Sequence, residues 1–336
     1  MNALIYHGPH DIRYTNTPVP SPKPNQVLLR VHHAGICGSD LHEYTHGPSS
    51  MPRAGQPHPL TNATIPCSTG HEFAGIVDSE TSLPSASNKT LPIGTKVVVD
   101  PRLYCSNCIN CKAGYTNGCV NWGFHGISGC CGGFGQYAAV DARMCHVLPL
   151  DTDLSIAPLC EPLAVAWHAV KLCGVESFKG RSVLILGGGP IGIALMFVLK
   201  VWGAWEEGSR VWVSEPSRRR SKQCEAFGAT VLDPTAVDVG KVCIDGTEGR
   251  GAEFVFDAAG SEHGMKDGFR ALAHRGTYVN LALWERPFTL PFSDFLTKDA
   301  MVKGSMCYDD DDFAATVRAF VEGRTLLMIN VRLHHC

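Results

Sequence analysis

The sequence predicts an α/β protein of two domains, a mainly antiparallel β domain followed by a doubly wound parallel sheet. Residues 1 to about 150 contain short β-rich runs separated by Pro- and Gly-rich turns. From about residue 160, short apolar strands alternate with apolar helices, which is typical of parallel βαβ units. The length of 336 residues also fits two domains, at roughly 150 residues each. We therefore expect a domain boundary near residue 160.

The composition excludes two broad classes of protein. Hydrophobic residues make up 44% and charged residues 18%, which favours a packed core over disorder. The 29 Lys and Arg against 32 Asp and Glu give a net charge of −3, and the basic run at residues 218–220 is too short for a nucleic-acid groove. A small-molecule partner is expected, and no nucleic acid.

Three features predict a cytoplasmic protein without a membrane span. The segment at residues 1–7 lacks the basic and long apolar regions of a signal peptide. Residues 182–199 carry no charge, but glycines and a proline interrupt them and they fall short of ~20 apolar residues. Without a signal peptide, the 15 cysteines are expected to be reduced thiols or metal ligands.

The N-terminal domain is predicted to contain short strands with long connecting loops. Strands are expected at residues 27–31, 74–77 and 96–99, because β-branched and apolar residues dominate these runs. The segment at residues 80–92 is rich in Ser, Thr and Pro, which predicts a surface loop.

In the C-terminal domain the predicted strands and helices alternate. Helices are expected at residues 164–173 and 191–202, and strands at residues 183–186, 210–214, 253–257 and 277–281. Parallel strands need such crossover helices, so these elements predict one parallel sheet.

Four cysteines of the N-terminal domain have the spacing of a metal site. They form the pattern Cys105-x2-Cys108-x2-Cys111-x7-Cys119. Four thiolates from one loop can close a tetrahedral shell around Zn²⁺ and leave no open position. We therefore predict a structural zinc site.

A glycine turn with the pattern G-x-G-x-x-G follows a predicted strand and begins a predicted helix. Gly187 allows the tight turn, Gly189 lets the backbone approach a pyrophosphate, and Gly192 lets the helix pack closely on the strand. Pro190 and Ile191 begin the helix, whose N-terminus favours phosphate charge. This context predicts a dinucleotide site.

The next predicted strand is followed by Glu215, which could accept hydrogen bonds from ribose hydroxyls. It lies 28 residues after Gly187 (215 − 187 = 28), beyond the usual ~20, and an inserted turn at residues 205–209 explains the excess. A carboxylate here would repel a 2′-phosphate, which predicts NAD(H) over NADP(H). The arginines at 218–220 could accept that phosphate, so they weigh against this choice.

Further potential zinc ligands are scattered along the chain: Cys37, His71 with Glu72, and Glu161. Three such ligands with one open position would form a catalytic zinc site. Each also has a simpler explanation: a buried thiol for Cys37, a core histidine for His71 and a surface charge for Glu161. Spacing alone does not decide between the two interpretations.

The combination of motifs resembles the zinc-containing medium-chain alcohol dehydrogenases over residues 1 to about 323. The motifs are GICGSDLHEY at residues 35–44, GHE at 70–72, the four-cysteine segment, GGF at 132–134, EPLAVAWHAV at 161–170 and the glycine turn. The residues His42, Glu43 and Tyr44 favour the 2,3-butanediol dehydrogenase branch over the sorbitol dehydrogenase branch.

The resemblance implies a GroES-like catalytic domain and a Rossmann NAD-binding domain. The catalytic domain would span residues 1–160, with residues 308–336 returning to it, and the Rossmann domain residues 161–307. A homodimer or homotetramer is also implied. The ending at residues 330–336 matches nothing in the family, so the chain is expected to be C-terminally shortened.

The resemblance also implies roles for single residues. The catalytic zinc would be held by Cys37, His71 and either Glu72 or Glu161, and Asp40 would orient His71. Ser39 and His42 stand where the family has its proton relay. Arg220 stands where NAD-specific relatives also carry an arginine.

The implied reaction is hydride transfer between NAD(H) and a small secondary alcohol or ketone. Zinc would lower the pKa of the alcohol, and its proton would leave through Ser39 and the cofactor ribose to His42. The expected substrate is a vicinal diol or acyloin, such as 2,3-butanediol and acetoin. The alternatives are a polyol dehydrogenase of the sorbitol or xylitol type, and a catalytically weak NAD-binding relative.

Overall fold

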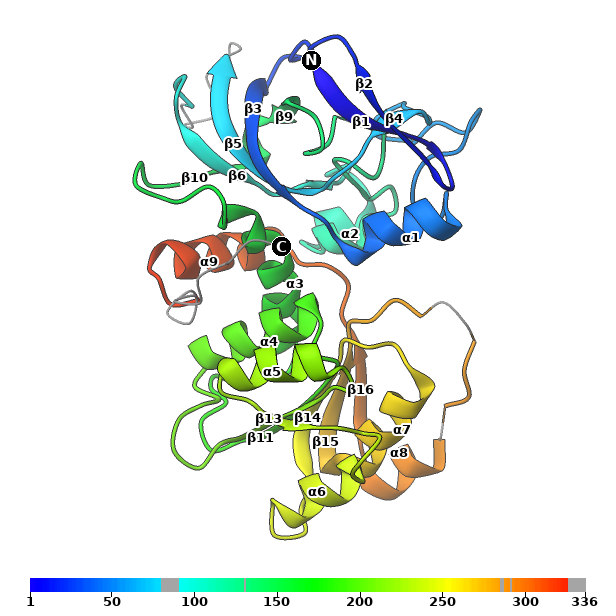
Figure 1. The fold of residues 1–336 in the computed structure, drawn as a ribbon, viewed down its shortest axis with the longest axis vertical. Coiled ribbons are helices and arrows are strands. Elements are labelled where there is room, and N and C mark those ends of the chain that lie inside the picture. Colours follow the sequence, from blue (N-terminus) through cyan, green and yellow to red (C-terminus); the bar gives the residue numbers. More distant parts are fainter. Residues whose placement is uncertain (80–90, 130, 285–286, 291, 326–336) are drawn as a thin grey trace. The chain divides into compact units, whose positions relative to one another are not determined.

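The computed structural model describes residues 1–79, 91–129, 131–284, 287–290 and 292–325. The chain forms two compact units (Figure 1). The first contains Met1–Glu161 and Asp309–Val317, and the second contains Pro162–Tyr308 and the described residues from Arg318 onward. Of the residues 308–336 that were expected to return to the first unit, Asp309–Val317 group with it, and residues 326–336 lie outside the described residues.

The first unit is built on a five-stranded antiparallel sheet in the order β10-β6-β5-β3-β9. These strands are β3 (Gln26–Gly35), β5 (Glu72–Ser79), β6 (Lys96–Val99), β9 (Tyr137–Asp141) and β10 (Cys145–Val147). Alternate residues of β3 such as Val27 and Leu29 enter a core that also contains Phe73 and Val97. Alternation of this kind is what a strand with one buried face requires.

Smaller elements complete the first unit. A three-stranded sheet has the order β2-β1-β4, from β1 (Asn2–Gly8), β2 (Asp11–Asn16) and β4 (Cys67–Ser68), and β7 (Arg102–Leu103) pairs with β8 (Gly123–Phe124). The helices are α1 (Gly38–His46) and α2 (Ile109–Lys112), with 3-10 turns η1 (Thr116–Gly118), η2 (Ala142–Met144) and η3 (Ala157–Leu159).

The first turn of α9 (Asp310–Val321) is bonded to a distant part of the first unit. Asp310 accepts hydrogen bonds from the buried Arg102 at 2.6 Å and from the hydroxyl of Tyr104 at 2.7 Å. The same guanidinium group donates to Asp100 through Nε at 3.0 Å and through a terminal nitrogen at 2.5 Å. One buried cation therefore joins two carboxylates that are 210 residues apart in the sequence (310 − 100 = 210).

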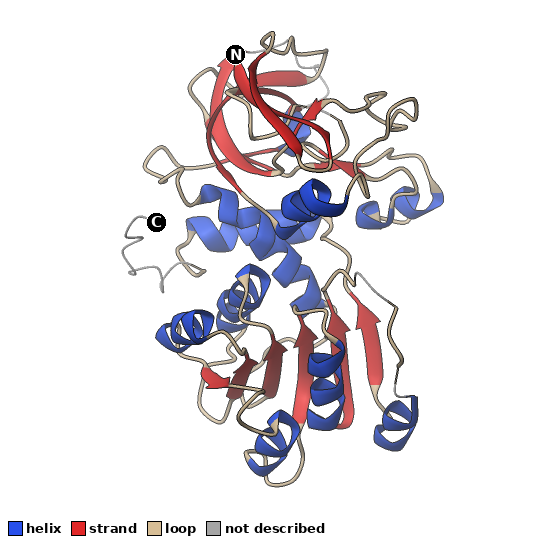
Figure 2. Cartoon of the chain, turned by 45° about the vertical axis from the view of Figure 1, so that its right-hand side comes forward, coloured by secondary structure: helices blue, strands red, loops and turns tan. Residues whose placement is uncertain are grey.

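The second unit is a six-stranded parallel sheet with helices on both faces (Figure 2). Its strand order is β13-β12-β11-β14-β15-β16, which is the doubly wound order 3-2-1-4-5-6. The strands are β11 (Ser182–Leu186), β12 (Arg210–Ser214), β13 (Thr230–Leu232), β14 (Ala252–Asp257), β15 (Leu272–Asn280) and β16 (Met301–Gly304). The helices of this part are α4 (Pro190–Val201), α5 (Arg218–Ala226), α6 (Val239–Asp245), α7 (Glu262–Ala271) and α8 (Phe292–Lys298), with α3 (Cys160–Lys171) from Pro162 onward and the end of α9 from Arg318 onward.

Strand β11 shows why this sheet has a core on each side. Val183 and Ile185 lie in one apolar cluster, whereas Leu184 and Leu186 lie in another. All four side chains are buried, so the strand is apolar throughout rather than alternating. Because β11 lies between β12 and β14, the glycine turn that follows this strand is at the centre of the sheet.

The predicted fold class is confirmed. The predicted strand at residues 96–99 coincides with β6, and the one at 210–214 coincides with β12. The other predicted strands and helices match observed elements to within a few residues, although β15 begins five residues earlier than predicted (277 − 272 = 5). Of the predicted loop at residues 80–92, residues 80–90 lie outside the described residues. Among the described residues no helix is both long and apolar enough to cross a membrane.

Candidate active site and metal centres

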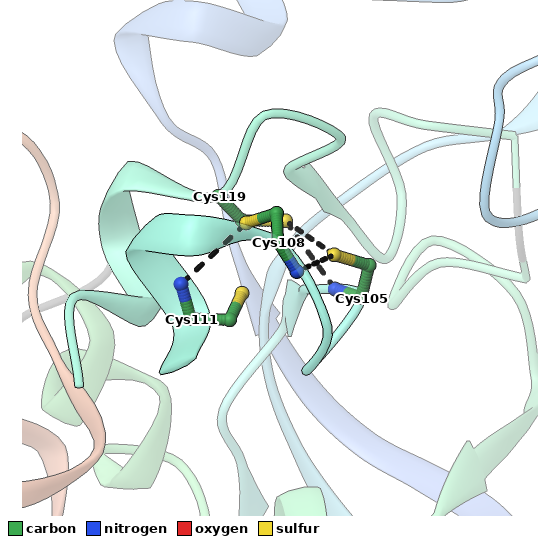
Figure 3. Close-up of side chains that lie close together, drawn as sticks. All are labelled: Cys105, Cys108, Cys111 and Cys119. Carbon is green, nitrogen blue, oxygen red and sulfur yellow. Dashed lines mark hydrogen bonds between the residues drawn. The ribbon is translucent and has the colours of Figure 1, made fainter. Parts of the chain in front are cut away.

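The four predicted cysteine ligands converge in a lobe around α2 (Figure 3). Their sulfur atoms all lie within 4.8 Å of one another, and the Sγ atoms of Cys105 and Cys119 are 3.5 Å apart. Tetrahedral zinc with bonds of about 2.3 Å would hold four sulfurs about 3.8 Å apart. The arrangement therefore fits one Zn²⁺ ion with a complete thiolate shell.

Backbone amides of the lobe point at these sulfurs and favour the thiolate form. The sulfur of Cys105 accepts from Cys108 N–H at 3.3 Å, and the sulfur of Cys119 accepts from Asn121 N–H at 3.4 Å. The backbone N–H groups of Cys111 and Val120 lower the pKa of Cys108 to about 6. Without a cation, burial and the neighbouring sulfurs raise the pKa of Cys111 to about 12. A lobe that prepares thiolates and crowds them together fits a cation at its centre.

A second cluster joins Cys37, His71 and Glu72, whose ligand atoms also lie within 4.8 Å of one another. Cys37 ends the loop before α1, and Glu72 is the first residue of β5. Gly35 pairs with Glu72 across β3 and β5, and a Cβ atom at Gly35 would overlap the Glu72 carboxylate. The glycine therefore leaves the space in which this carboxylate reaches the cluster.

The turn that carries His71 is held by residues 132–134. Gly70 has φ of +88°, its carbonyl accepts from Gly133 N–H at 2.7 Å, and the carbonyl of Thr69 accepts from Phe134 N–H at 2.9 Å. A Cβ atom at Gly70 would lie 2.6 Å from the Phe134 ring. The segment at 132–134 therefore holds the turn that precedes His71 in place.

The imidazole of His71 lies between two polar groups of α1. Its Nε2 is 3.4 Å from the hydroxyl of Ser39, and its Nδ1 is 3.6 Å from a carboxylate oxygen of Asp40. The other oxygen of Asp40 accepts from Cys37 N–H at 2.9 Å. The ring of Phe124 meets the imidazole edge-on, with centroids 5.9 Å apart. Asp40 thus lies where it can fix the orientation of His71, as the family resemblance implies.

The electrostatics of this cluster also fit a cation. Burial lowers the pKa of His71, but the neighbouring Asp40 and Cys37 and the charge of Glu161 raise it by more, so that it ends well above its ordinary value. Burial raises the pKa of Glu72. The half-buried thiol and the buried imidazole and carboxylate are the ligand types of a catalytic zinc site. Of the two candidate glutamates, Glu72 lies in the cluster, and Glu161, buried near the start of α3, acts on His71 through its charge.

Ser39 and His42 lie on α1, three residues apart. Ser39 contacts the ligand cluster through His71, whereas Nδ1 of His42 lies 3.4 Å from the hydroxyl of Ser49. His42 therefore stands further from the cluster along the same helix.

The glycine turn joins β11 to α4, as expected. Gly187 has φ of +93°, Gly189 caps α4, and Pro190 is its first residue. A Cβ atom at Gly192 would overlap the carbonyl of Gly187, whereas nothing lies within 4 Å of such an atom at Gly189. The turn therefore packs tightly on one side and leaves its backbone open on the other, as a phosphate group requires.

Glu215 follows β12 directly and is buried beside the glycine turn. Its carboxylate accepts hydrogen bonds from Gly188 N–H and Ser217 N–H, each at 2.8 Å. Arg220 lies 3.6 Å from the same carboxylate, with its side chain largely exposed. Glu215 thus fixes the glycine turn, and its role toward a ribose stays a prediction.

Two buried acidic residues beside these sites were not predicted. Asp257 ends β14, accepts from Ala259 N–H and Gly260 N–H at 2.9 Å and from Tyr278 at 2.7 Å, and so shapes the loop next to Gly187. Glu43 on α1 accepts from two backbone amides of the following loop. An acidic residue directly after the buried strand run at 252–256 was the available signal for Asp257.

Comparison with known proteins identifies the family. The model of the alcohol dehydrogenase GroES-like domain matches residues 23–150, and the model of the zinc-binding dehydrogenases matches residues 190–322. The chain is also 36% identical to a probable (R)-acetoin-forming diacetyl reductase of Saccharomyces cerevisiae, over 96% of this chain and 80% of that protein. The chain belongs to the zinc-binding alcohol dehydrogenases.

This alcohol dehydrogenase is similar to two further proteins of known class. The crystal structure of 2R,3R-butanediol dehydrogenase from Bacillus subtilis matches with a TM-score of 0.86 and 32% identity, over 96% of this chain and 88% of that one. A probable D-xylulose reductase of Aspergillus terreus is 30% identical over 96% of this chain and 88% of that protein. The comparisons do not support the expected C-terminal shortening, and residues 330–336, which motivated it, lie outside the described residues.

The alcohol dehydrogenase is therefore a zinc-dependent oxidoreductase that acts on a small-molecule alcohol. Its predicted membership of the butanediol dehydrogenase branch is confirmed by these relatives.

Proposed function

We propose that this dehydrogenase interconverts a vicinal diol and its acyloin, such as 2,3-butanediol and acetoin, with NAD(H) as the hydride carrier. The observation that carries the proposal is the Cys37, His71 and Glu72 cluster, which offers three zinc ligands. The likeness to a diacetyl reductase and to a butanediol dehydrogenase supports the substrate class.

The residues of the cluster have separate roles in this proposal. Cys37, His71 and Glu72 hold the metal, and Asp40 keeps the imidazole of His71 in place through Nδ1. Glu161 adds negative charge near His71. Zinc held there supplies a Lewis acid that lowers the pKa of the alcohol hydroxyl group, and the nicotinamide accepts the hydride.

The proton of the alcohol leaves by way of α1. The hydroxyl of Ser39, which lies beside His71, would take the proton as it passes its own proton on, and the imidazole of His42 on the same helix would be the final acceptor.

Glu215 selects the cofactor. Its carboxylate repels a 2′-phosphate and accepts hydrogen bonds from free ribose hydroxyls. The backbone amides of Gly188 and Ser217 donate to this carboxylate, and the guanidinium group of Arg220 lies 3.6 Å from it, so these groups hold it in place. We therefore assign NAD(H) to this site, with the pyrophosphate at the turn of Gly187, Gly189, Pro190, Ile191 and Gly192.

Absorbance at 340 nm tests the reaction. Purified enzyme is incubated with NAD⁺ and each stereoisomer of 2,3-butanediol, and with sorbitol and xylitol at equal concentration. We expect NADH formation with at least one butanediol isomer and a lower kcat/KM for both polyols. Equal or faster turnover of the polyols would replace the diol assignment with the second candidate, a polyol dehydrogenase, which the likeness to a D-xylulose reductase favours. NADH binding without turnover of any substrate would leave the third interpretation, a non-catalytic relative.

Two further expectations remain proposals. We expect a homodimer or homotetramer, which sedimentation at micromolar concentration would test. We also expect a cytoplasmic location, since all cysteines in the described part of the chain are free thiols.

A further inference from the structure

Helix α1 carries a further metal-binding pattern, of which the proposed dehydrogenase reaction uses only His42. The residues His42-Glu43-Tyr44-Thr45-His46 form the sequence H-E-x-x-H, and all five lie within the helix. On a helix this spacing puts two imidazoles on one face, one turn apart, where they can share a metal ion. The pattern lies outside the Cys37, His71 and Glu72 cluster and the cysteine lobe.

The geometry of the two imidazoles fits a shared ion. Their ring centroids are 5.3 Å apart and their planes are tilted by 41°. A ring centroid lies about 3.2 Å from a zinc ion that one of its nitrogens binds at about 2.1 Å, so a tetrahedral angle separates two such centroids by about 5.2 Å. His46 is exposed and His42 is half-buried, so an ion could reach them from solvent. The pair is therefore close to chelating geometry without movement of the helix.

The glutamate of the pattern has a different task, and this excludes a peptidase-type site. Glu43 is buried, and its two carboxylate oxygens accept from Ser49 N–H at 2.9 Å and from Ser50 N–H at 2.5 Å. In a metallopeptidase this residue must activate a metal-bound water as general base. Here it holds the loop after α1 instead, so the pattern provides binding without hydrolysis.

We propose that His42 and His46 form a surface site for a divalent transition-metal ion such as Zn²⁺, distinct from the two zinc sites of the fold. Two neutral imidazoles and solvent would complete the coordination, which makes binding weaker than at a four-cysteine site and reversible. An ion bound to His42 makes one of its ring nitrogens unavailable to the alcohol proton. The site thus lowers turnover when free zinc rises, and this second part rests on the proposed role of His42 in proton transfer.

The test separates binding from its effect on turnover. Enzyme with its two resident zinc ions is dialysed against micromolar ZnCl₂, and bound zinc per chain is measured together with the initial rate. Zinc is the probe because it is redox-inert and replaces the resident ions only with itself. For the wild type we expect one further zinc per chain and a reversible fall in kcat.

His46→Gln is the informative variant, because His46 has no part in the proposed reaction. We expect it to keep the wild-type rate without added zinc, and to bind the additional zinc at least about tenfold more weakly, the lower limit for loss of even an outer partner of a metal ligand. His33→Gln is the matched control, since His32 and His33 form another exposed imidazole pair on β3, with Nδ1 atoms 2.7 Å apart. It should keep both the additional zinc at α1 and the inhibition.

Each outcome decides one part of the proposal. Unchanged zinc binding in His46→Gln, or loss of binding and inhibition in His33→Gln alone, would overturn the site at α1. If His46→Gln lost the additional zinc but was still inhibited by added zinc, the link to turnover would be overturned, whereas the metal site itself would stand. An enzyme inactive on every alcohol would remove the proposed function, whereas the zinc count would still test the site.

Discussion

The catalytic cluster depends on side chains that touch no ligand as much as on those that do. Asp40 lies against the imidazole of His71 and also bonds the backbone of Cys37, so one carboxylate positions two of the three ligands. Partners of this kind set the tautomer and the basicity of a metal-bound histidine. The cluster is thus an arrangement of α1 and β5, rather than three independent residues.

Removal of His71 should abolish the catalytic metal while the fold is retained. We expect His71→Ala to bind one zinc instead of two and to lose at least about 100-fold in kcat/KM, the upper end of what even an outer partner of a metal ligand contributes. Elemental analysis and the 340 nm assay measure both. Cys108→Ser is the complementary variant, which should lose the other zinc and also solubility, because its metal closes a structural lobe. If His71→Ala kept two zinc ions, the ligand assignment would be incorrect.

Neutralising Glu215 should weaken the choice of cofactor. In Glu215→Gln we expect the ratio of kcat/KM for NAD⁺ to that for NADP⁺ to fall about tenfold or more, since removal of ~1.4 kcal/mol of like-charge repulsion equals a factor of ten. Glu225→Gln, an exposed carboxylate on α5, is the control and should leave the ratio unchanged. A wild-type enzyme that prefers NADP⁺ would contradict the assignment at once.

At the scale of elements, the turn at residues 69–70 determines the position of His71, which directly precedes β5. Its shape depends on the positive φ of Gly70 and on the hydrogen bonds from residues 133 and 134. The glycine is therefore expected to matter through geometry, although it has no side chain to bind anything.

Gly70→Ala should disturb this turn and the metal with it. The left-handed conformation costs an alanine about 1–2 kcal/mol, and the methyl group would press on the ring of Phe134, so we expect Tm to fall by about 3–8 °C. The catalytic zinc should also become labile to chelators. In Gly38→Ala, at a position where nothing lies within 4 Å of the new methyl group, neither effect is expected. Calorimetry with and without a chelator measures both, and equal behaviour of the two variants would argue against the turn.

The elements also show how far a sequence can be interpreted. Periodicity and glycine spacing predicted β6, β11 and the turn after it, because these are local signals. The cysteine lobe was predicted for the same reason, since its four ligands lie within fifteen residues of chain (119 − 105 + 1 = 15). Cys37 and Glu161 were assigned only through family resemblance, because residues far apart meet through tertiary packing. Glu43 was not found because its role depends on two backbone amides, which no side-chain pattern encodes.

At the scale of the whole molecule, each unit has its own apolar clusters. The first unit also buries a histidine that belongs to neither of the predicted metal sites. This residue, His125, is 2% exposed. Burial lowers the pKa of His125 to about 4. The stability of this unit should therefore respond to acid in a way that the motifs do not predict.

The sign of this effect follows from proton binding. Between about pH 6.5 and pH 4 the unfolded chain binds a proton at His125 that the folded chain does not, so stability falls as the pH decreases through this range. The lowering of this pKa from 6.5 to about 4 corresponds to a loss on the order of 3 kcal/mol near pH 4. Denaturant unfolding of wild type and His125→Phe from pH 7.5 to pH 4.5 measures it. The variant should show a shallower decline, and identical slopes would contradict a role for His125.

The bonds of Arg102 to Asp100 and Asp310 have a consequence for how the protein is made. A ribosome that adds about 5–20 residues per second needs roughly 10–40 s to synthesise the 208 residues that separate Arg102 from Asp310. During that interval the nascent β unit lacks residues 309–317, and one carboxylate partner of its buried cation does not yet exist. All strands of the parallel sheet lie between Ser182 and Gly304 in the sequence. This sheet can therefore form before Asp310 is synthesised. The N-terminal half of this enzyme is thus translated first and completed last.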